Sequence, residues 1–190
     1  MSRWAPKEEM QQRILETADR LFYRDGIRAV GVDTVAAEIG ISKRTLYNHY
    51  PSKDDLIAAY LQRRFTPLEI TDTPPQEQIL QFFDRLECSL ARKSFRGCPF
   101  VNAVAELAEV SHAANKVAIA FKECRRKWFR ELLDKLGVEN ADLLATQLAL
   151  LLDGAIAAAL VRRDPKVAQA AKAAAQVLLN AAGRARKTRT

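Results

Sequence analysis

Glycine and proline are scarce in this chain, with seven of each among 190 residues. So few turn-forming residues leave little material for a many-stranded sheet or for low-complexity linkers. The abundant residues, chiefly Leu, Ala, Glu, Gln, Lys and Arg, lose little rotamer freedom in a helix. The sequence therefore predicts an all-α protein, and its length fits a small head joined to a larger body.

Cysteine and histidine are rarer still. The cysteines, Cys88, Cys98 and Cys124, are odd in number and form no CxxC pair, which implies no disulfide framework and suits a reducing cytoplasm. His112 has no cysteine or carboxylate at ligand spacing, so we expect no metal site. Cys98 precedes a predicted helix, where a thiolate would be stabilised. Redox sensing by Cys98 and an inert thiol are the two alternatives, and we favour the inert thiol.

Catalytic motifs are also missing from the sequence. It contains no phosphate-binding glycine loop and no GxSxG motif, so we expect no cofactor and no enzymatic activity. A helical hydrolase or transferase stays open as an alternative that no feature supports. A signal peptide is not expected either, because the first twelve residues hold no apolar run.

One long apolar run, residues 143–161, raises the question of a membrane span. Gln147 and Asp153 interrupt the run, and a carboxylate at the centre of a membrane costs about 3 kcal/mol on insertion scales. We therefore expect a helix buried on most sides in a soluble protein, with no membrane partner.

Acidic residues are absent from residues 40–53, although residues 1–65 as a whole are nearly balanced, with 11 Lys and Arg against 9 Asp and Glu. Much of the net charge of +7 lies instead in residues 183–190, which carry four basic groups and no acid. We expect these eight residues to be a disordered basic tail that adds non-specific attraction to DNA. The local bias of residues 40–53 is stronger evidence for nucleic acid than the overall charge.

The apolar spacing near the N-terminus predicts short helices over residues 6–24, 32–39, 43–50 and 53–65. Gly40 provides the turn between the second and third helices, and Ser42 is a good N-cap for the third. Pro51 ends the third helix, and Ser52 opens the fourth with a capping box. The first three helices make a head, and the fourth leads from it towards the body.

The second and third helices have the plan of a helix-turn-helix, whose second helix enters the major groove of DNA. Leu46 and Tyr50 are four residues apart and would face the core of the head. The exposed side chains of the third helix would then donate hydrogen bonds to phosphates and base edges. The residues that point outward in this arrangement are Lys43, Arg44, Tyr47 and Asn48, with Lys53 at the start of the next helix.

Residues 13–61 resemble the head of the tetracycline-repressor (TetR) family. The likeness includes LFYRDG at the end of the first helix and AAEIGISKRTLYNHYPSKDDL from the second helix to the fourth. Gly31 departs from the family pattern, which often has threonine there. The resemblance implies that the phosphate and base contacts fall on Ser42, Lys43, Arg44, Thr45, Tyr47, Asn48, His49 and Lys53. For His49, a role in supporting the third helix is an equal alternative to DNA contact.

Residues 76–182 are predicted to form a helical body, and the resemblance implies that this body binds a small-molecule effector. The candidate pocket residues are Phe83, Phe100, Asn102, Glu106, Phe121 and Trp128. Each aromatic residue, taken singly, is explained at least as well by packing in a core. Asn102 and Glu106 lie four residues apart on an apolar helix and would fix the orientation of a ligand.

The last two predicted helices, residues 143–161 and 165–182, are rich in small and apolar side chains. They would form half of a four-helix bundle between two copies of the chain, which is how the TetR family pairs. The predicted interface residues are Leu148, Leu152, Asp153, Ala170, Ala174, Val177 and Leu178. Asp153 has an alternative role as the buried partner of an arginine.

Taken together, the sequence predicts a DNA-binding domain over residues 1–65 and a ligand-binding and dimerisation domain over residues 76–182. The expected function is that of a cytoplasmic transcriptional regulator, most simply a homodimeric repressor that a small molecule releases from a palindromic operator. The alternative is a helical adaptor that binds proteins and has no sequence-specific contact with DNA.

Overall fold

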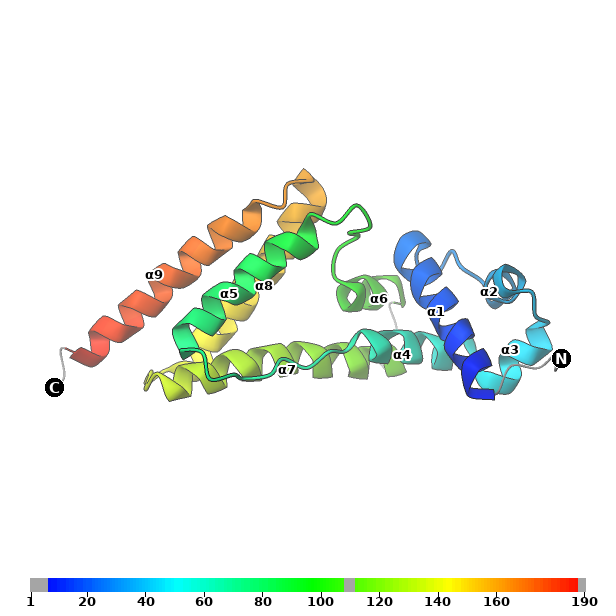
Figure 1. Ribbon diagram of the computed structural model, residues 1–190, viewed down its shortest axis with the longest axis horizontal. Helices are drawn as coiled ribbons and strands as arrows, with labels where there is room; N and C mark the ends of the chain where they lie inside the picture. The colour runs from blue at the N-terminus through cyan, green and yellow to red at the C-terminus, as the bar shows by residue number, and fades with distance from the viewer. Residues whose placement is uncertain (1–6, 108–111, 188–190) are drawn as a thin grey trace. The chain divides into compact units, whose positions relative to one another are not determined.

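The computed structural model describes residues 7–107 and 112–187, and it gives side chains as far as residue 183. Within these ranges the chain folds into helices without a strand, as the sequence predicts (Figure 1). The helices are α1 (Lys7–Asp25), α2 (Val32–Ile39), α3 (Lys43–His49), α4 (Lys53–Arg64), α5 (Pro75–Leu90), α6 (Pro99–Leu107), α7 (Ala113–Lys135), α8 (Ala141–Arg162) and α9 (Val167–Lys187).

The chain divides into two compact units, each made of two stretches of sequence. Unit 1 comprises residues 1–66 and 99–121, and unit 2 comprises residues 67–98 and 122–190. Unit 1 therefore contains α1 to α4 together with α6 and the beginning of α7. The segment predicted to bind DNA shares its compact unit with two helices that the sequence analysis assigned to the body.

The core of unit 1 forms where α1 packs against α2 and α4. Ile14 and Ala18 of α1, Val35 of α2 and Leu61 of α4 are completely buried there. These residues recur at helical spacing, so one apolar stripe of each helix faces the common core. Arg64 joins the polar sides of α1 and α4. Two nitrogens of its guanidinium donate hydrogen bonds to the two oxygens of the Asp19 carboxylate. The guanidinium carbon also lies 4.1 Å from the centre of the Tyr23 ring.

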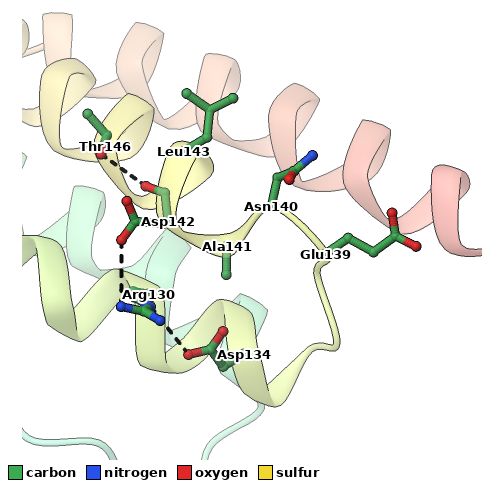
Figure 2. Close-up of a pocket in the computed structure, with 8 residues that line it drawn as sticks. All are labelled: Arg130, Asp134, Glu139, Asn140, Ala141, Asp142, Leu143 and Thr146. Carbon is green, nitrogen blue, oxygen red and sulfur yellow. Dashed lines mark hydrogen bonds and ion pairs between the residues drawn. The ribbon is translucent and has the colours of Figure 1, made fainter.

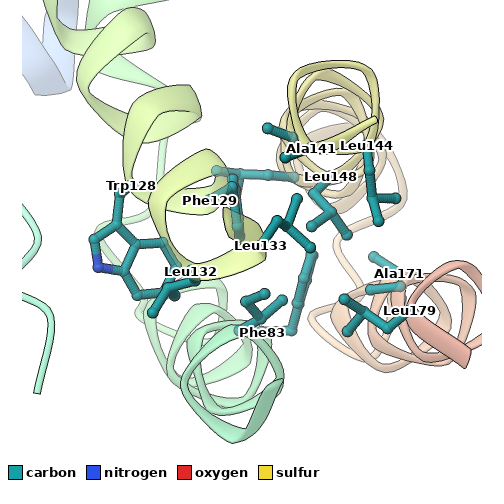
Figure 3. Packing of buried hydrophobic residues seen from close by; sticks show 14 of the residues in the cluster. Phe83, Trp128, Phe129, Leu132, Leu133, Ala141, Leu144, Leu148, Ala171 and Leu179 are labelled. Atoms are coloured by element: carbon teal, nitrogen blue, oxygen red, sulfur yellow. The ribbon is translucent and has the colours of Figure 1, made fainter. Parts of the chain in front are cut away.

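The core of unit 2 is built by α5, the later part of α7, α8 and α9 (Figure 3). Phe83 of α5 packs with Phe129, Leu132 and Leu133 of α7, all of them fully buried. Leu148 of α8 and small residues of α9 complete the cluster. Because α9 presents alanines to its neighbours, its backbone can lie close to α5 and α8, along which it runs.

Helix α8 is long and apolar enough to cross a membrane by length and composition, and the part of the chain that the structure describes contains one such helix. A third of its apolar window is buried inside the chain. The sequence analysis expected burial on most sides, so α8 is more exposed in the single chain than predicted. Large apolar side chains, including Leu143 and Leu150, lie on its outer surface.

The segment between α4 and α5 is held to unit 2 by two side chains. The amide of Gln78 accepts a hydrogen bond from the Thr71 N–H and donates to the carbonyls of Thr71 and Thr73. The Trp128 Nε1–H donates to the Glu69 carbonyl at 3.1 Å. Gln78 is buried away from water, so these bonds supply the hydrogen-bond partners that its amide needs.

The predicted helix bounds agree closely with the structure except at the C-terminus. The second helix has the bounds predicted for it, Val32–Ile39, and the third is one residue shorter than expected. Helix α9 continues to Lys187, whereas the sequence analysis ended it near Ala182 and expected a disordered tail from residue 183. Ala, Arg and Lys are strong helix formers, which explains why the helix extends. The remaining tail residues, 188–190, lie outside the described part of the chain.

Candidate nucleic-acid interface

The turn between α2 and α3 is fixed by Gly40. Its backbone is left-handed, with φ of 72°, and its N–H donates to the carbonyls of Ala36 and Ala37. The Ile41 N–H donates to the Ala36 carbonyl at 3.0 Å. A side chain other than glycine is strained in this conformation. Gly40 thus ends α2 and directs the chain into the next helix.

Helix α3 begins at an N-cap and ends at a proline, as predicted. The Ser42 hydroxyl accepts a hydrogen bond from the Thr45 N–H at 3.0 Å. Tyr50 adopts an extended conformation before Pro51 and closes the helix, because proline disfavours helical geometry in the residue that precedes it. Leu46 and Tyr50 are both buried in the core of unit 1. This anchoring leaves the opposite face of the short helix open to solvent.

The exposed face of α3 carries Lys43, Arg44, Tyr47 and Asn48. The Tyr47 side chain is 36% exposed and is one of the large apolar side chains on the surface. These four residues are the ones that the helical spacing predicted to point outward. Together they offer two cations, a phenol and an amide, which are the groups that bind phosphates and base edges in DNA.

Lys43 has a partner that the sequence analysis missed. Its ammonium lies 3.0 Å from the carboxylate of Asp33, in the first turn of α2. The hydrogen bond with this carboxylate raises the pKa of Lys43, so the lysine stays fully charged. Asp33 therefore offsets part of the positive charge on the face formed by α3.

Three other predicted contact residues are half-buried. The Thr45 hydroxyl lies 2.9 Å from that of Ser42, and Nδ1 of His49 is buried without a hydrogen-bond partner among the described residues. The Lys53 ammonium donates to the Ile27 carbonyl at 2.7 Å, in the turn between α1 and α2. Lys53 thus has a structural bond within unit 1 that its position in the sequence does not reveal.

The candidate pocket residues divide between the two units. Phe83 and Trp128 belong to the core cluster of unit 2. In unit 1 the Phe100 and Phe121 rings stack with centroids 3.8 Å apart, and the Phe65 ring meets both edge-on. Asn102 is half-buried on α6. Four of the six candidate residues therefore belong to unit 1 and two to unit 2.

Glu106 makes a hydrogen bond within unit 1 that the sequence did not predict. One oxygen of its carboxylate accepts a hydrogen bond from the Arg28 N–H at 2.9 Å. The donor is a backbone amide of the turn between α1 and α2, and the role of Glu106 in orienting an effector stays a prediction. The partner is 78 residues away in sequence, which is why residue spacing did not indicate it.

A pocket of about 440 Å³ lies in unit 2 where α7 leads into α8 (Figure 2). None of the predicted pocket residues lines it. Asp142 in its wall pairs with Arg126 and Arg130, and Arg130 also reaches Asp134. The pocket is lined by Arg130, Asp134, Glu139, Asn140, Ala141, Asp142, Leu143 and Thr146. Most charged groups of the pocket therefore already form ion pairs with side chains of the protein.

The predicted interface residues lie partly in the chain's own core. Leu148 is completely buried and Leu152 nearly so, which means that their side chains have no surface to offer to a second copy. Asp153 pairs with Lys122 of α7, and its side chain is 41% exposed, so it is not the buried partner of an arginine that the alternative described. Val177 of α9 is 67% exposed, Ala170 is exposed, and Ala174 and Leu178 are half-buried.

Comparison with known proteins matches both parts of the chain. Residues 14–60 match the model for bacterial regulatory proteins of the tetR family. Residues 75–174, more than half of the chain, match the model for the C-terminal domain of LmrA/YxaF-like transcriptional regulators. An HTH-type transcriptional regulator of Staphylococcus aureus is 39% identical over 56 residues. That match spans 30% of this chain and 30% of the relative's length.

Solved structures extend the likeness over almost the full length. A tetR-type transcriptional regulator from Streptomyces avermitilis is 35% identical, with a TM-score of 0.82, and the alignment covers 90% of this chain and 97% of that one. A TetR-family regulator from Streptomyces coelicolor is 29% identical with the same TM-score, over 93% and 97% of the two chains. The family match at residues 14–60 contains α2 and α3, and the chain belongs to the TetR family of transcriptional regulators.

Proposed function

We propose that the protein is a cytoplasmic repressor that binds a palindromic operator as a homodimer and is released by a small molecule. The observation that carries the proposal is the exposed face of α3, where Arg44, Tyr47 and Asn48 project from a helix fixed by Leu46 and by the Ser42 cap. We propose no catalytic activity, since the chain's role is to bind DNA.

In the proposed complex, α3 lies in the major groove. The Arg44 guanidinium matches the two acceptors on the edge of guanine, and the Asn48 amide matches adenine. Tyr47 donates its hydroxyl to a phosphate, as does Ser42 at the start of the helix. Lys43 exchanges the Asp33 carboxylate for a phosphate. Thr45, His49 and Lys53 support this face from half-buried positions.

A homodimer is supported by apolar side chains that the single chain leaves exposed on α8 and α9. Leu150 is 65% exposed and Val177 is 67% exposed, and both lie on the helices predicted to pair. An interface built on them would bury this surface and place the two copies of α3 about a two-fold axis. The operator would then consist of two half-sites about 34–36 Å apart, or a multiple of that distance.

Release by an effector requires that the effector bind the two states of the dimer with different affinities. The body is proposed as its binding region, since the family match at residues 75–174 covers it. A solved transcriptional regulator of the same fold, from Saccharomonospora viridis, was crystallised in complex with choline.

The test is selection of DNA by the purified full-length protein from a pool of random duplexes, at two salt concentrations. We expect a palindrome to be enriched, and its binding to weaken steeply with salt because phosphate contacts release counterions. Arg44→Ala should weaken binding and relax the preference at one position in each half-site. Tyr47→Phe, which removes only the hydroxyl, should weaken binding to all sequences alike.

Two outcomes would contradict the proposal. Binding that shows no sequence preference and is unchanged in Arg44→Ala would mean that α3 does not read DNA. Enrichment of a single half-site without a palindrome would mean that the protein does not bind as a symmetric dimer. A protein-binding adaptor would give the first of these outcomes.

A further inference from the structure

We propose that Glu106 of α6 is a positioning residue for DNA binding, which acts by holding residues 26–30, the turn between α1 and α2. The proposal rests on the proposed DNA contact through α3. It goes beyond that contact because it assigns a role in operator affinity to a residue outside the helix-turn-helix. Glu106 itself has no need to touch DNA.

The first observation is the hydrogen bond between Glu106 and the turn. The Arg28 N–H donates to Oε2 of Glu106 at 2.9 Å. The turn's own backbone bonds join Gly26 N–H to the Phe22 carbonyl and Val30 N–H to the Gly26 carbonyl. The amide of Arg28, midway along the turn, is directed to a carboxylate on another helix. A hydrogen bond to an ionised acceptor is among the stronger kinds in proteins.

The second observation is the close approach of the same carboxylate to Gly26. A Cβ atom at this position would lie 3.1 Å from Oε2 and 3.4 Å from Oε1 of Glu106. Gly26 also has a φ of 96°, a conformation that other residues rarely adopt. The missing side chain of Gly26 therefore leaves room for the Glu106 carboxylate, and the positive φ favours glycine at this position. The carboxylate therefore packs against the backbone of the turn at Gly26 in addition to its hydrogen bond with Arg28.

The third observation is a second hydrogen bond to the same turn, made by a donor where Glu106 is an acceptor. The Lys53 ammonium donates to the carbonyl of Ile27, the residue next to Arg28, at 2.7 Å. An acceptor from α6 and a donor from α4 thus fix adjacent residues of one turn. Ile27 and Val30 are buried, so the apolar side chains of the turn are held as well as its backbone.

The turn leads directly into the DNA-binding helices. Helix α2 begins at Val32, two residues after Val30, and the Gly40 turn then fixes α3 relative to α2. A change in the conformation of residues 26–30 therefore alters the direction in which α2 starts and moves the face of α3 with it. Base contacts tolerate little misplacement, so a small shift of α3 lowers affinity for the operator.

Simple electrostatics predict the opposite effect. Removing an acidic residue from a DNA-binding protein reduces repulsion of phosphates and should leave binding unchanged or slightly tighter. A loss of affinity on removal of Glu106 would therefore point to positioning. Glu106→Gln and Glu106→Ala carry the same charge, but only glutamine keeps an oxygen that can accept from Arg28. The difference between these two variants isolates the hydrogen bond.

The experiment measures the affinity of full-length wild type, Glu106→Ala and Glu106→Gln for the operator that the wild type selects, and for an unrelated duplex. We expect Glu106→Ala to bind the operator about tenfold more weakly, as the loss of one charged hydrogen bond suggests, and Glu106→Gln to stay within about threefold of wild type. Affinity for the unrelated duplex should be the same in all three proteins. Glu131→Ala, at an exposed position on α7, is the matched control and should bind as wild type does.

The outcomes distinguish failure of the positioning role from failure of the proposed regulator function. If the wild type selects an operator and Glu106→Ala binds it as tightly, the positioning role is wrong while the regulator stands. If the wild type selects no sequence, the proposed function fails and the positioning role falls with it. If Glu106→Ala does not fold, Glu106→Asp replaces it. Its carboxylate is one methylene too short, and wild-type affinity in that variant would also overturn the role.

Discussion

At the scale of single residues, several polar side chains in this protein bind backbone groups that lie far away in the sequence. Glu106 binds the Arg28 amide, Lys53 binds the Ile27 carbonyl, and Trp128 binds the Glu69 carbonyl. The sequence analysis assigned the first to an effector, the second to DNA and the third to a pocket. Those roles stay predictions, and the backbone partners could not be predicted because only the fold brings each side chain to its partner.

The Arg64 guanidinium provides a test of geometry at this scale, because it binds Asp19 with two nitrogens and stacks over Tyr23. Lysine keeps the charge of arginine but loses the second bond and the stacking. We expect Arg64→Lys to lower the free energy of unfolding by about 1 kcal/mol, measured by urea denaturation. The neighbouring Arg63→Lys is the control: Arg63 pairs with Glu16 through one nitrogen at 3.2 Å and should change stability by less than about 0.5 kcal/mol. Equal effects in the two variants would count against the geometric explanation.

Tyr60 provides a test of burial. It is 1% exposed, and burial raises the pKa of its hydroxyl above the ordinary value of 10.0. The unfolded chain therefore loses this proton at lower pH than the folded protein does. The stability that the neutral phenol contributes is complete below pH 10 and is lost as the pH rises further. We expect Tyr60→Phe to make the decline of unfolding free energy above about pH 10 less steep, as followed by denaturation at successive pH values. An unchanged slope would mean that Tyr60 ionises alike in both states.

At the scale of helices, the sequence predicted most boundaries because the signals that end a helix are local. Gly40, Ser42, Pro51 and Ser52 have the roles that their residue types indicate. Helix α8 is different, because apolar residues lie all round it and periodicity does not show which face the chain itself covers. Leu148 and Leu152 were therefore assigned to an interface, although both are buried in unit 2.

The N-cap of α4 gives a prediction at this scale. The Ser52 hydroxyl accepts from the Asp55 N–H at 3.0 Å and lies 2.6 Å from the Asp55 carboxylate. We expect Ser52→Ala to lower the free energy of unfolding by about 1 kcal/mol, because it leaves an amide of the first turn without its partner. The measurement is urea denaturation, with Ser94→Ala in an exposed position after α5 as the control. A control variant that loses as much stability would show that the cap has no special effect.

At the scale of the whole molecule, the single chain leaves several large apolar side chains exposed on α8 and α9. The large exposed side chains include Leu143, Leu150 and Val161 of α8 and Val177 of α9. Exposed apolar side chains on neighbouring helices are typical of a site of association. The pairing of two chains through α8 and α9 stays a prediction that a measurement of oligomeric state must test.

Leu150→Glu is the test of the proposed dimer. A charge on this side chain, which is 65% exposed, should prevent burial against a second copy and give a monomer in analytical ultracentrifugation. Ile119→Glu on α7 is a matched control, because Ile119 is also 65% exposed but lies on a helix outside the proposed interface. We expect the control to sediment as wild type does. A dimeric Leu150→Glu, or equal dissociation in both variants, would place the interface elsewhere.

The ion pair between Lys43 and Asp33 has a consequence for how the regulator searches a chromosome. In the proposed complex, Lys43 must give up its bond to Asp33 for each bond to a phosphate, so the net attraction to a random sequence is smaller than the count of basic residues suggests. Weak attraction shortens the time spent at each wrong site. We therefore expect a protein that samples many sites briefly and stops where Arg44 and Asn48 meet the bases that match them.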